Sequence, residues 1–207
     1  MIQKNTIIYV VDDDESICKA LSLLLKSHGY RVETFTSASA FLAFKHPKLL
    51  SCLISDIRLP NINGFALQEA MAQQGIITPV IFITGYGDIP MTVKAMKAGA
   101  IDFLAKPFTD ETLLNAIILA LSKSKLQNKE QIEMAKIRGR VNTLSPRELE
   151  VFQFVAQGLM NKNIATKRGT SLQTIKVHRS RVMQKMQAKT VTELIHFAQK
   201  IGIVPSS

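Results

Sequence analysis

Two apolar runs that are continuous rather than alternating constrain the fold of this chain most strongly. Ile7–Val11 reads IIYVV and Val80–Thr84 reads VIFIT, and both runs are rich in β-branched residues. Such strands are typical of a parallel sheet that helices cover on both faces. Three shorter runs also have strand character: Arg31–Phe35, Leu53–Ser55 and Asp102–Ala105. We therefore expect a parallel five-stranded sheet.

Helical patterns separate the expected strands. Glu15–His28 has apolar residues at helical spacing and stops at Gly29. The same pattern is found in Gly64–Gln74, Pro90–Ala98 and Asp110–Leu121. Five strands with five intervening helices, of which these four can be assigned to segments, predict an α/β doubly wound domain over residues 1–122. In such a domain, ligands bind beyond the carboxyl ends of the strands.

Charge distinguishes the two parts of the chain. Residues 1–122 contain 10 Lys and Arg against 11 Asp and Glu, whereas residues 123–207 contain 16 against 5. A basic excess confined to one part indicates that this part meets a polyanion. Residues 123–140 are strongly charged and have few apolar residues. They are expected to be a linker, either a helical extension of the preceding helix or a flexible tether.

Residues 141–207 have a purely helical pattern. Ser145 is placed to cap a helix that has Pro146 in its first turn and ends at Gln157. The following helices are expected at Asn161–Arg168, Ser171–Met186 and Thr190–Lys200. The tight turn at Gly169, between the second and third of these helices, predicts a helix-turn-helix within an all-α four-helix domain.

Polar residues follow or end four of the five expected strands. They are Asp12, Asp13, Asp14, Asp56, Thr84 and Lys106. Clustered carboxylates repel one another unless a cation neutralises them, and hard oxygen ligands favour Mg2+. A carboxylate can attack phosphorus to form an acyl phosphate, while Mg2+ and Lys106 offset the added charge. Asp14 is instead expected to cap the first helix.

Cysteine content and hydropathy limit where the protein can act. Cys18 and Cys52 are too few and too far apart for a metal cluster, and we expect two reduced thiols in a protein core. No run of 18 apolar residues and no signal-peptide pattern is present. These features predict a soluble cytoplasmic protein with no membrane partner.

Four segments carry a resemblance to a known family: VVDDDES, ISDIRLPNINGF, IFITGYGD and AGAIDFLAKPF. In order and spacing they resemble the signature segments of response-regulator receiver domains, which have a CheY-like (flavodoxin-like) fold, and above all those of the FixJ-type subgroup. The match covers roughly residues 5–122. It implies a histidine kinase as partner, Asp56 as the phosphoacceptor and Mg2+ as the cofactor.

The resemblance also implies roles for single residues. Mg2+ would be bound by Asp12, Asp13, Asp56 and the backbone carbonyl of Arg58. Lys106 would pair with the phosphoryl group, and the Lys106–Pro107 bond would be cis. Thr84 and Phe103 would form a switch that follows phosphorylation. Phosphorylation would then produce a homodimer through the fourth helix, fifth strand and fifth helix, near the apolar residues Ile89 and Met91.

The segment from Leu144 to Ile195 resembles the four-helix DNA-binding domain of the NarL/LuxR family, and the likeness spans about residues 143–200. It implies double-stranded DNA as a partner, and RNA polymerase is a further candidate. Base-edge contacts would come from Lys176, Val177 and Ser180, and phosphate contacts from Arg179, Arg181 and Lys185. His178 is expected to pack or to face phosphate.

Two residues depart from the family pattern at the turn. Arg168 stands where the family usually has Leu, and Thr170 stands where it usually has Ile. Both positions normally pack the turn against the core. Their replacement by polar residues predicts a weaker or looser DNA-binding domain, unless the stem of Arg168 packs and its charged end reaches water.

Two other classes of function remain as alternatives to a transcriptional regulator. A phosphatase of the haloacid dehalogenase kind would use a nucleophilic Asp after the first strand and a substrate cap, whereas here the aligned nucleophile, Asp56, follows the third strand. A receiver with an RNA-binding helical output is the second alternative. The turn and the basic helix favour duplex DNA and a protein that is not an enzyme.

Overall fold

A computed structural model describes residues 5–85 and 89–203, apart from the side chains of Ile89, Pro90, Met91 and Lys94. The predicted apolar contacts of Ile89 and Met91 therefore lie outside the described residues. The chain divides into two compact units, Met1–Asn128 and Lys129–Ser207. Each unit is described by itself.

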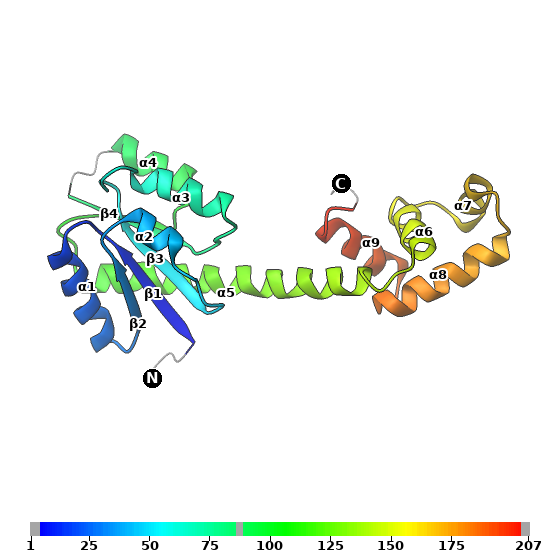
Figure 1. Cartoon of the computed structure of the whole chain (residues 1–207), viewed down its shortest axis with the longest axis horizontal. Helices are drawn as coiled ribbons and strands as arrows, with labels where there is room; N and C mark the ends of the chain where they lie inside the picture. Colours follow the sequence, from blue (N-terminus) through cyan, green and yellow to red (C-terminus); the bar gives the residue numbers. More distant parts are fainter. Residues whose placement is uncertain (1–4, 86–88, 204–207) are drawn as a thin grey trace. The chain divides into compact units, whose positions relative to one another are not determined.

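The first unit contains a five-stranded parallel sheet with the order β2-β1-β3-β4-β5. This confirms the α/β doubly wound architecture (Figure 1). Strand β3 is longer than predicted at both ends, because its pairing with β1 begins at Leu50 opposite Thr6. The strands are β1 Thr6–Val11, β2 Arg31–Phe35, β3 Leu50–Asp56, β4 Val80–Thr84 and β5 Asp102–Ala105.

Helices cover both faces of this sheet, as the continuous apolar strands predicted (Figure 1). In β1, Ile8 and Val10 join the core beneath α1 and α5, whereas Ile7, Tyr9 and Val11 join the core beneath α2, α3 and α4. The short helix α2, which Ser37 caps, was not among the predicted segments. The helices are α1 Glu15–Ser27, α2 Ala38–Ala43, α3 Gly64–Gln73, α4 Ile89–Lys97 and α5 Asp110–Val141.

Helix α5 extends well beyond its predicted end at Leu121, so the segment 123–140 is helical. It also contributes to both compact units. The buried hydroxyl of Ser124 accepts a hydrogen bond from the Ser51 amide at 3.0 Å, whereas Ile137 is buried in the core of the second unit. The sparse apolar residues that suggested a linker differ in burial, because Leu126 and Ile132 are exposed whereas Ile137 is buried.

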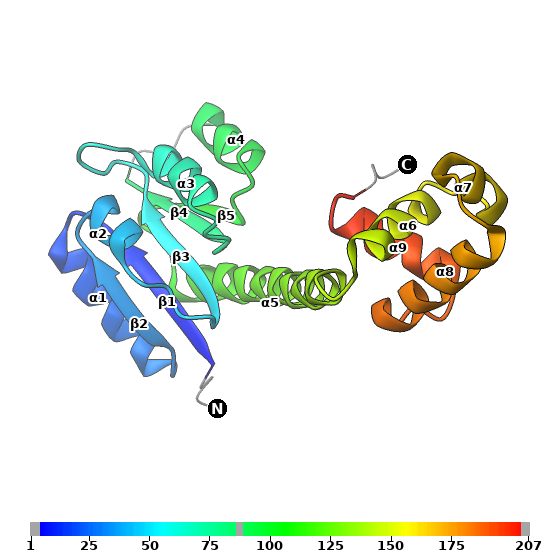
Figure 2. The same ribbon diagram turned by 45° about the vertical axis from the view of Figure 1, so that its right-hand side comes forward.

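The second unit is built from four helices after the end of α5: α6 Pro146–Ala156, α7 Asn161–Arg168, α8 Leu172–Met186 and α9 Val191–Lys200 (Figure 2). Its core includes Phe152, Ile164, Val182 and Leu194. Ser145 and Glu148 form the predicted capping box, and Gly169 ends α7 with a left-handed φ of 58°. In the described part of the chain, no helix is long and apolar enough to cross a membrane.

Candidate phosphoacceptor pocket and nucleic-acid interface

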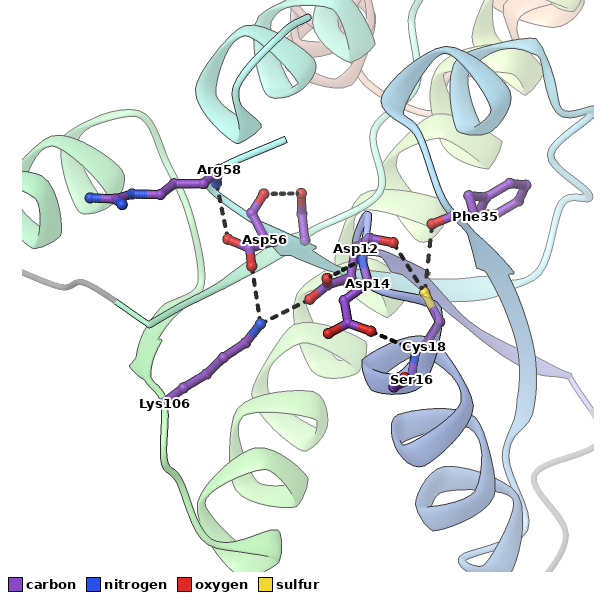
Figure 3. A network of polar contacts seen from close by, with 9 residues as sticks. Asp12, Asp14, Ser16, Cys18, Phe35, Asp56, Arg58 and Lys106 are labelled. Atoms are coloured by element: carbon purple, nitrogen blue, oxygen red, sulfur yellow. Dashed lines mark hydrogen bonds and ion pairs between the residues drawn. The ribbon is translucent and has the colours of Figure 1, made fainter. Parts of the chain in front are cut away.

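The predicted pocket lies at the carboxyl ends of β1, β3 and β5, and Lys106 is at its centre (Figure 3). The Lys106 ammonium lies 2.9 Å from Asp12 Oδ2 and 3.0 Å from Asp56 Oδ2. The second oxygen of Asp56 accepts a hydrogen bond from the Arg58 amide at 2.9 Å. Three segments that are far apart in the sequence thus place two carboxylates on one cation.

Close packing holds strand β3, which ends at Asp56, against helix α3. Gly64 begins α3, and a Cβ built on it would lie 2.8 Å from the Asp56 carbonyl oxygen and 2.9 Å from Cε1 of Phe82. Only glycine fits this approach without a shift of its neighbours. Sequence reasoning placed a helix start at Gly64 but gave no signal for this contact.

Burial and the neighbouring charges have opposite effects on the pKa values of Asp12 and Lys106. Asp12 is 1% exposed, and this burial raises the pKa of Asp12, while hydrogen bonds from Lys106 and the Asp14 amide partly offset the rise. Burial of Lys106 favours its neutral form, but its hydrogen bonds to Asp12 and Asp56 outweigh that effect and raise the pKa of Lys106. The ammonium therefore stays charged between the two carboxylates.

The loop after β1 is held by contacts on both sides (Figure 3). Asp14 caps α1 as predicted, because its Oδ1 accepts a hydrogen bond from the Ser16 amide at 2.7 Å. The Cys18 thiol lies 3.4 Å from the Asp12 carbonyl oxygen and is buried, as expected of a core cysteine. Cys52 is likewise a free, buried thiol.

The pocket's donor set fits a hard divalent cation. In residues 5–85 and 89–203, no three acidic, His or Cys side chains are already arranged around a common metal position. Mg2+ does not need such a cage, because it binds one or two carboxylates and keeps several waters. Asp12, Asp13 and Asp56 together carry more negative charge than Lys106 neutralises, and Asp13 is exposed at the mouth of the loop. These oxygens are the ligands that Mg2+ prefers.

The two predicted switch residues lie beside the pocket on β4 and β5. Thr84 is fully buried, and its carbonyl oxygen accepts a hydrogen bond from the Lys106 amide at 2.8 Å. Phe103 is half-buried and packs against the core beneath α3 and α4. The Lys106–Pro107 bond that follows β5 is cis, as predicted.

Helix α8 has one buried face and one exposed face. Ile175, Val182 and Met186 are buried in the core of the second unit. The predicted base-edge residues Lys176, Val177 and Ser180 are exposed, and so is the predicted phosphate contact Arg181. Val177 is apolar and 41% exposed.

Two predicted phosphate contacts, Arg179 and Lys185, also have partners inside the protein. Lys185 Nζ lies 2.6 Å from Glu148 Oε2 and 3.0 Å from the Thr143 carbonyl oxygen. Arg179 donates a hydrogen bond to Asn161 Oδ1 at 2.6 Å and so connects α8 to the start of α7. Sequence reasoning identified Glu148 in the capping box, but residue types alone gave no signal that Lys185 binds it.

The turn between α7 and α8 contains two polar residues at positions where the family usually has apolar ones. Arg168 pairs with Glu150 of α6, while Thr170 is exposed and its amide bonds the Ala165 carbonyl oxygen. An ion pair thus replaces the apolar packing that the family usually has at position 168. His178 is half-buried, and its Nδ1 has no hydrogen-bond partner within the described part of the chain.

Fold and site together define a class of protein: a receiver with a paired-carboxylate and lysine pocket, joined to a helix-turn-helix unit. Family comparisons agree with this class. Residues 8–118 match the response regulator receiver domain, and residues 142–198 match the luxR family of bacterial regulatory proteins. The chain belongs to the response-regulator family and combines a receiver with a LuxR-type DNA-binding domain.

Several relatives resemble the chain over nearly its whole length. Nodulation protein W of Bradyrhizobium diazoefficiens is 44% identical over 95% of this chain and 87% of that protein. The transcriptional regulatory protein FixJ of Rhizobium meliloti is 40% identical over 96% of this chain and 98% of its own length. This degree of identity confirms the predicted FixJ-type relationship and a role in regulating transcription.

Solved structures agree with this relationship. The response regulator StyR is 41% identical to this chain, has a TM-score of 0.75 and is matched over 95% of this chain and 99% of its own. Full-length FixJ from B. japonicum is 39% identical, with a TM-score of 0.54, over 96% of this chain and 98% of its own. Both receiver and helix-turn-helix therefore occur together in solved relatives.

Proposed function

We propose that this chain is a response regulator in which phosphorylation of Asp56 by a histidine kinase controls sequence-specific binding to double-stranded DNA. The observation that carries this proposal is the Lys106 ammonium held between Asp12 and Asp56. A phosphoacceptor needs a carboxylate that is ionised, reachable and close to a cation. The Asp56 side chain is 13% exposed, so a donor can approach it, and Lys106 supplies the charge.

In the proposed reaction, an Asp56 carboxylate oxygen attacks the phosphorus of a phosphohistidine, and the histidine nitrogen leaves. Lys106 can exchange its contact with Asp56 for one with a phosphoryl oxygen, because its ammonium lies beside Asp56 and is also held by Asp12. The Arg58 amide continues to orient Asp56 through its 2.9 Å hydrogen bond. Asp12 keeps Lys106 charged and directed into the pocket.

Mg2+ is the proposed cofactor, bound by Asp12, Asp13, Asp56 and the Arg58 carbonyl oxygen. When bound, it would offset the charge on the transferred phosphoryl group. The net negative charge that remains after Lys106 is counted supports this assignment.

Thr84 and Phe103 are proposed to report the phosphorylated state. The Thr84 hydroxyl would move toward a phosphoryl oxygen, and the half-buried Phe103 ring would turn inward. The phosphoryl group can shift such an equilibrium only if it binds one arrangement better than the other, and this hydroxyl contact supplies the difference. Homodimerisation through α4, β5 and α5 would follow.

On DNA, the exposed face of α8 is proposed to enter the major groove. Lys176, Val177 and Ser180 would read base edges, and Arg181 would bind phosphate. A transcriptional role makes RNA polymerase a further candidate partner and implies action in the cytoplasm. A binding assay with matched DNA and RNA duplexes tests the choice of nucleic acid, and preference for RNA would contradict the proposal.

Phosphorylation of the full chain by acetyl phosphate tests the phosphoacceptor. Intact-protein mass spectrometry should show one added phosphate on wild type in the presence of Mg2+ and none after chelation. Asp56→Asn should remain unlabelled, because its amide is not a nucleophile. Asp110→Asn, in the first turn of α5, is the matched control and should be labelled like wild type. A labelled Asp56→Asn protein would overturn the assignment.

A further inference from the structure

The helical domain contains few acidic residues, and nearly every one has an evident structural task. Residues 141–207 include Glu148, Glu150 and Glu193 as their acidic residues. Glu148 is buried and binds Lys185. Glu193 accepts a hydrogen bond from the Lys189 amide at 2.8 Å, and its own amide bonds the Thr190 cap of α9. Both carboxylates therefore hold helix ends in place.

Glu150 has a different kind of partner. Its Oε1 pairs with the Arg168 guanidinium, and its Oε2 lies 3.6 Å from NH1 of Arg147. The side chain of Glu150 is 30% exposed, and that of Arg168 is 28% exposed. One carboxylate near the surface thus pairs with two guanidiniums, which are the side chains that bind phosphate most readily.

Arg168 is placed where DNA would approach. It is the last residue of α7 and precedes the Gly169 turn, and Ser171 caps the recognition helix α8. In helix-turn-helix proteins, the N-terminal residues of the recognition helix contact the base edges, so the turn lies close to the duplex. An unpaired guanidinium at this turn would be available to a phosphate.

Stability gives little reason for the arrangement. Partly exposed ion pairs add little to folding stability, and cations at a helix C-terminus are already favoured by the helix dipole. A carboxylate beside a DNA-binding turn also repels phosphates. Phosphate contacts provide affinity without sequence information, so a residue that suppresses them increases discrimination between sequences.

We propose that Glu150 is a specificity-determining residue that withholds Arg168 from DNA phosphates and so lowers sequence-independent binding. This inference rests on the proposed DNA-binding function. It gives the departure at position 168 a purpose, because the Arg168–Glu150 pair controls how many cations the domain offers to any duplex.

The test compares Glu150→Gln with Glu193→Gln in the full chain, since both substitutions remove one negative charge from the same domain. The readout is binding to a random-sequence DNA duplex over a range of salt concentrations. Glu150→Gln should tighten binding and steepen the salt dependence by about one unit, since each phosphate contact contributes about 0.9. Glu193→Gln should leave the slope close to that of wild type.

A second substitution identifies the released cation. Adding Arg168→Gln to Glu150→Gln should reverse at least half of the increase in slope, and thermal unfolding checks that each variant is folded. Equal slopes for Glu150→Gln and Glu193→Gln would overturn the inference while leaving DNA binding intact. Failure of the wild-type protein to bind any duplex would instead contradict the proposed function, and with it this inference.

Discussion

Charged residues are arranged differently in the two compact units. In the first unit, charges converge on one point, where Lys106 lies within 3.0 Å of both Asp12 and Asp56. In the second unit, Glu148 and Glu150 are occupied by internal contacts, and exposed basic residues remain on α8. The first arrangement suits chemistry on a single phosphoryl group, and the second suits an extended polyanion. The positions of the partners of these charged residues therefore indicate the function of each unit better than the number of charges does.

The largest effect on stability is expected when a crowded glycine is replaced by alanine. The same replacement at a glycine with open space around it is the comparison. Gly64→Ala places a methyl group 2.8 Å from the Asp56 carbonyl oxygen, so it should lower the free energy of unfolding by about 3 kcal/mol. Gly139→Ala, inside α5 with no atom within 4 Å of the new Cβ, should stabilise by about 0.5–1 kcal/mol.

Denaturant unfolding of both variants measures this contrast, with acetyl phosphate labelling as a second readout for the pocket. Because Gly64 packs against the phosphoacceptor strand, Gly64→Ala should also slow labelling of Asp56. A Gly64→Ala protein as stable as wild type would show that α3 can move away from β3, and the close approach would then not fix the position of Asp56.

The next prediction compares two lysines of α8: Lys185, which binds the buried Glu148, and Lys176, which is proposed to contact DNA. Lys185→Met should lower the free energy of unfolding by about 2 kcal/mol, since it leaves the buried Glu148 carboxylate short of a partner. Chemical denaturation measures the loss, and Lys176→Met is the matched control because Lys176 is exposed on the same helix. Equal stability of the two variants would return Lys185 to the predicted phosphate contacts.

The same pair has a defined pH dependence. The hydrogen bond from Lys185, with help from the Ser145 amide, lowers the pKa of Glu148 from 4.5 to about 2. A lowered carboxyl pKa stabilises the fold fully above about pH 4.5, and this contribution is lost as the pH falls through about 2. The stability difference between wild type and Lys185→Met should therefore shrink across this range on acidification.

Effects on DNA binding, which leave folding stability unchanged, should distinguish base reading from phosphate binding on α8. Lys176→Ala should cost about 1–3 kcal/mol on the selected site and relax sequence preference. Arg181→Ala should weaken all duplexes alike and lower the salt slope by about one unit. Selection from random oligonucleotides followed by salt titration measures both. An unchanged selected sequence for Lys176→Ala would remove it from the base contacts.

The receiver site could be predicted from sequence because its chemistry depends on strand ends. An apolar run shows where a buried parallel strand stops, and the carboxyl ends of parallel strands lie at one edge of the sheet. Sequence therefore predicts that Asp12, Asp56 and Lys106 lie at the same edge. Helix α2 was missed because six residues with one cap carry little periodic signal. The contact of Gly64 with β3 depends on packing distances that no spacing encodes.

In the DNA-binding unit, sequence predicts the helix bounds well but does not predict the partners of the surface side chains. Caps at Ser145 and Ser171 and the turn at Gly169 marked the helix ends correctly. The partners of Lys185 and Arg179 depend instead on how α6, α7 and α8 cross, which periodicity does not specify. The pairing of Arg168 with Glu150 depends on the same crossing of helices, so the sequence shows only that Arg168 departs from the family pattern.

One measurement tests the central claim that phosphorylation of Asp56 in the first unit controls DNA binding by the second. The affinity of wild type and Asp56→Asn for a selected duplex is measured by fluorescence anisotropy, with and without acetyl phosphate and Mg2+. Wild type should bind more tightly after treatment, while Asp56→Asn should bind equally weakly under both conditions. Equal tightening of both proteins, or no change in fully phosphorylated wild type, would contradict the account.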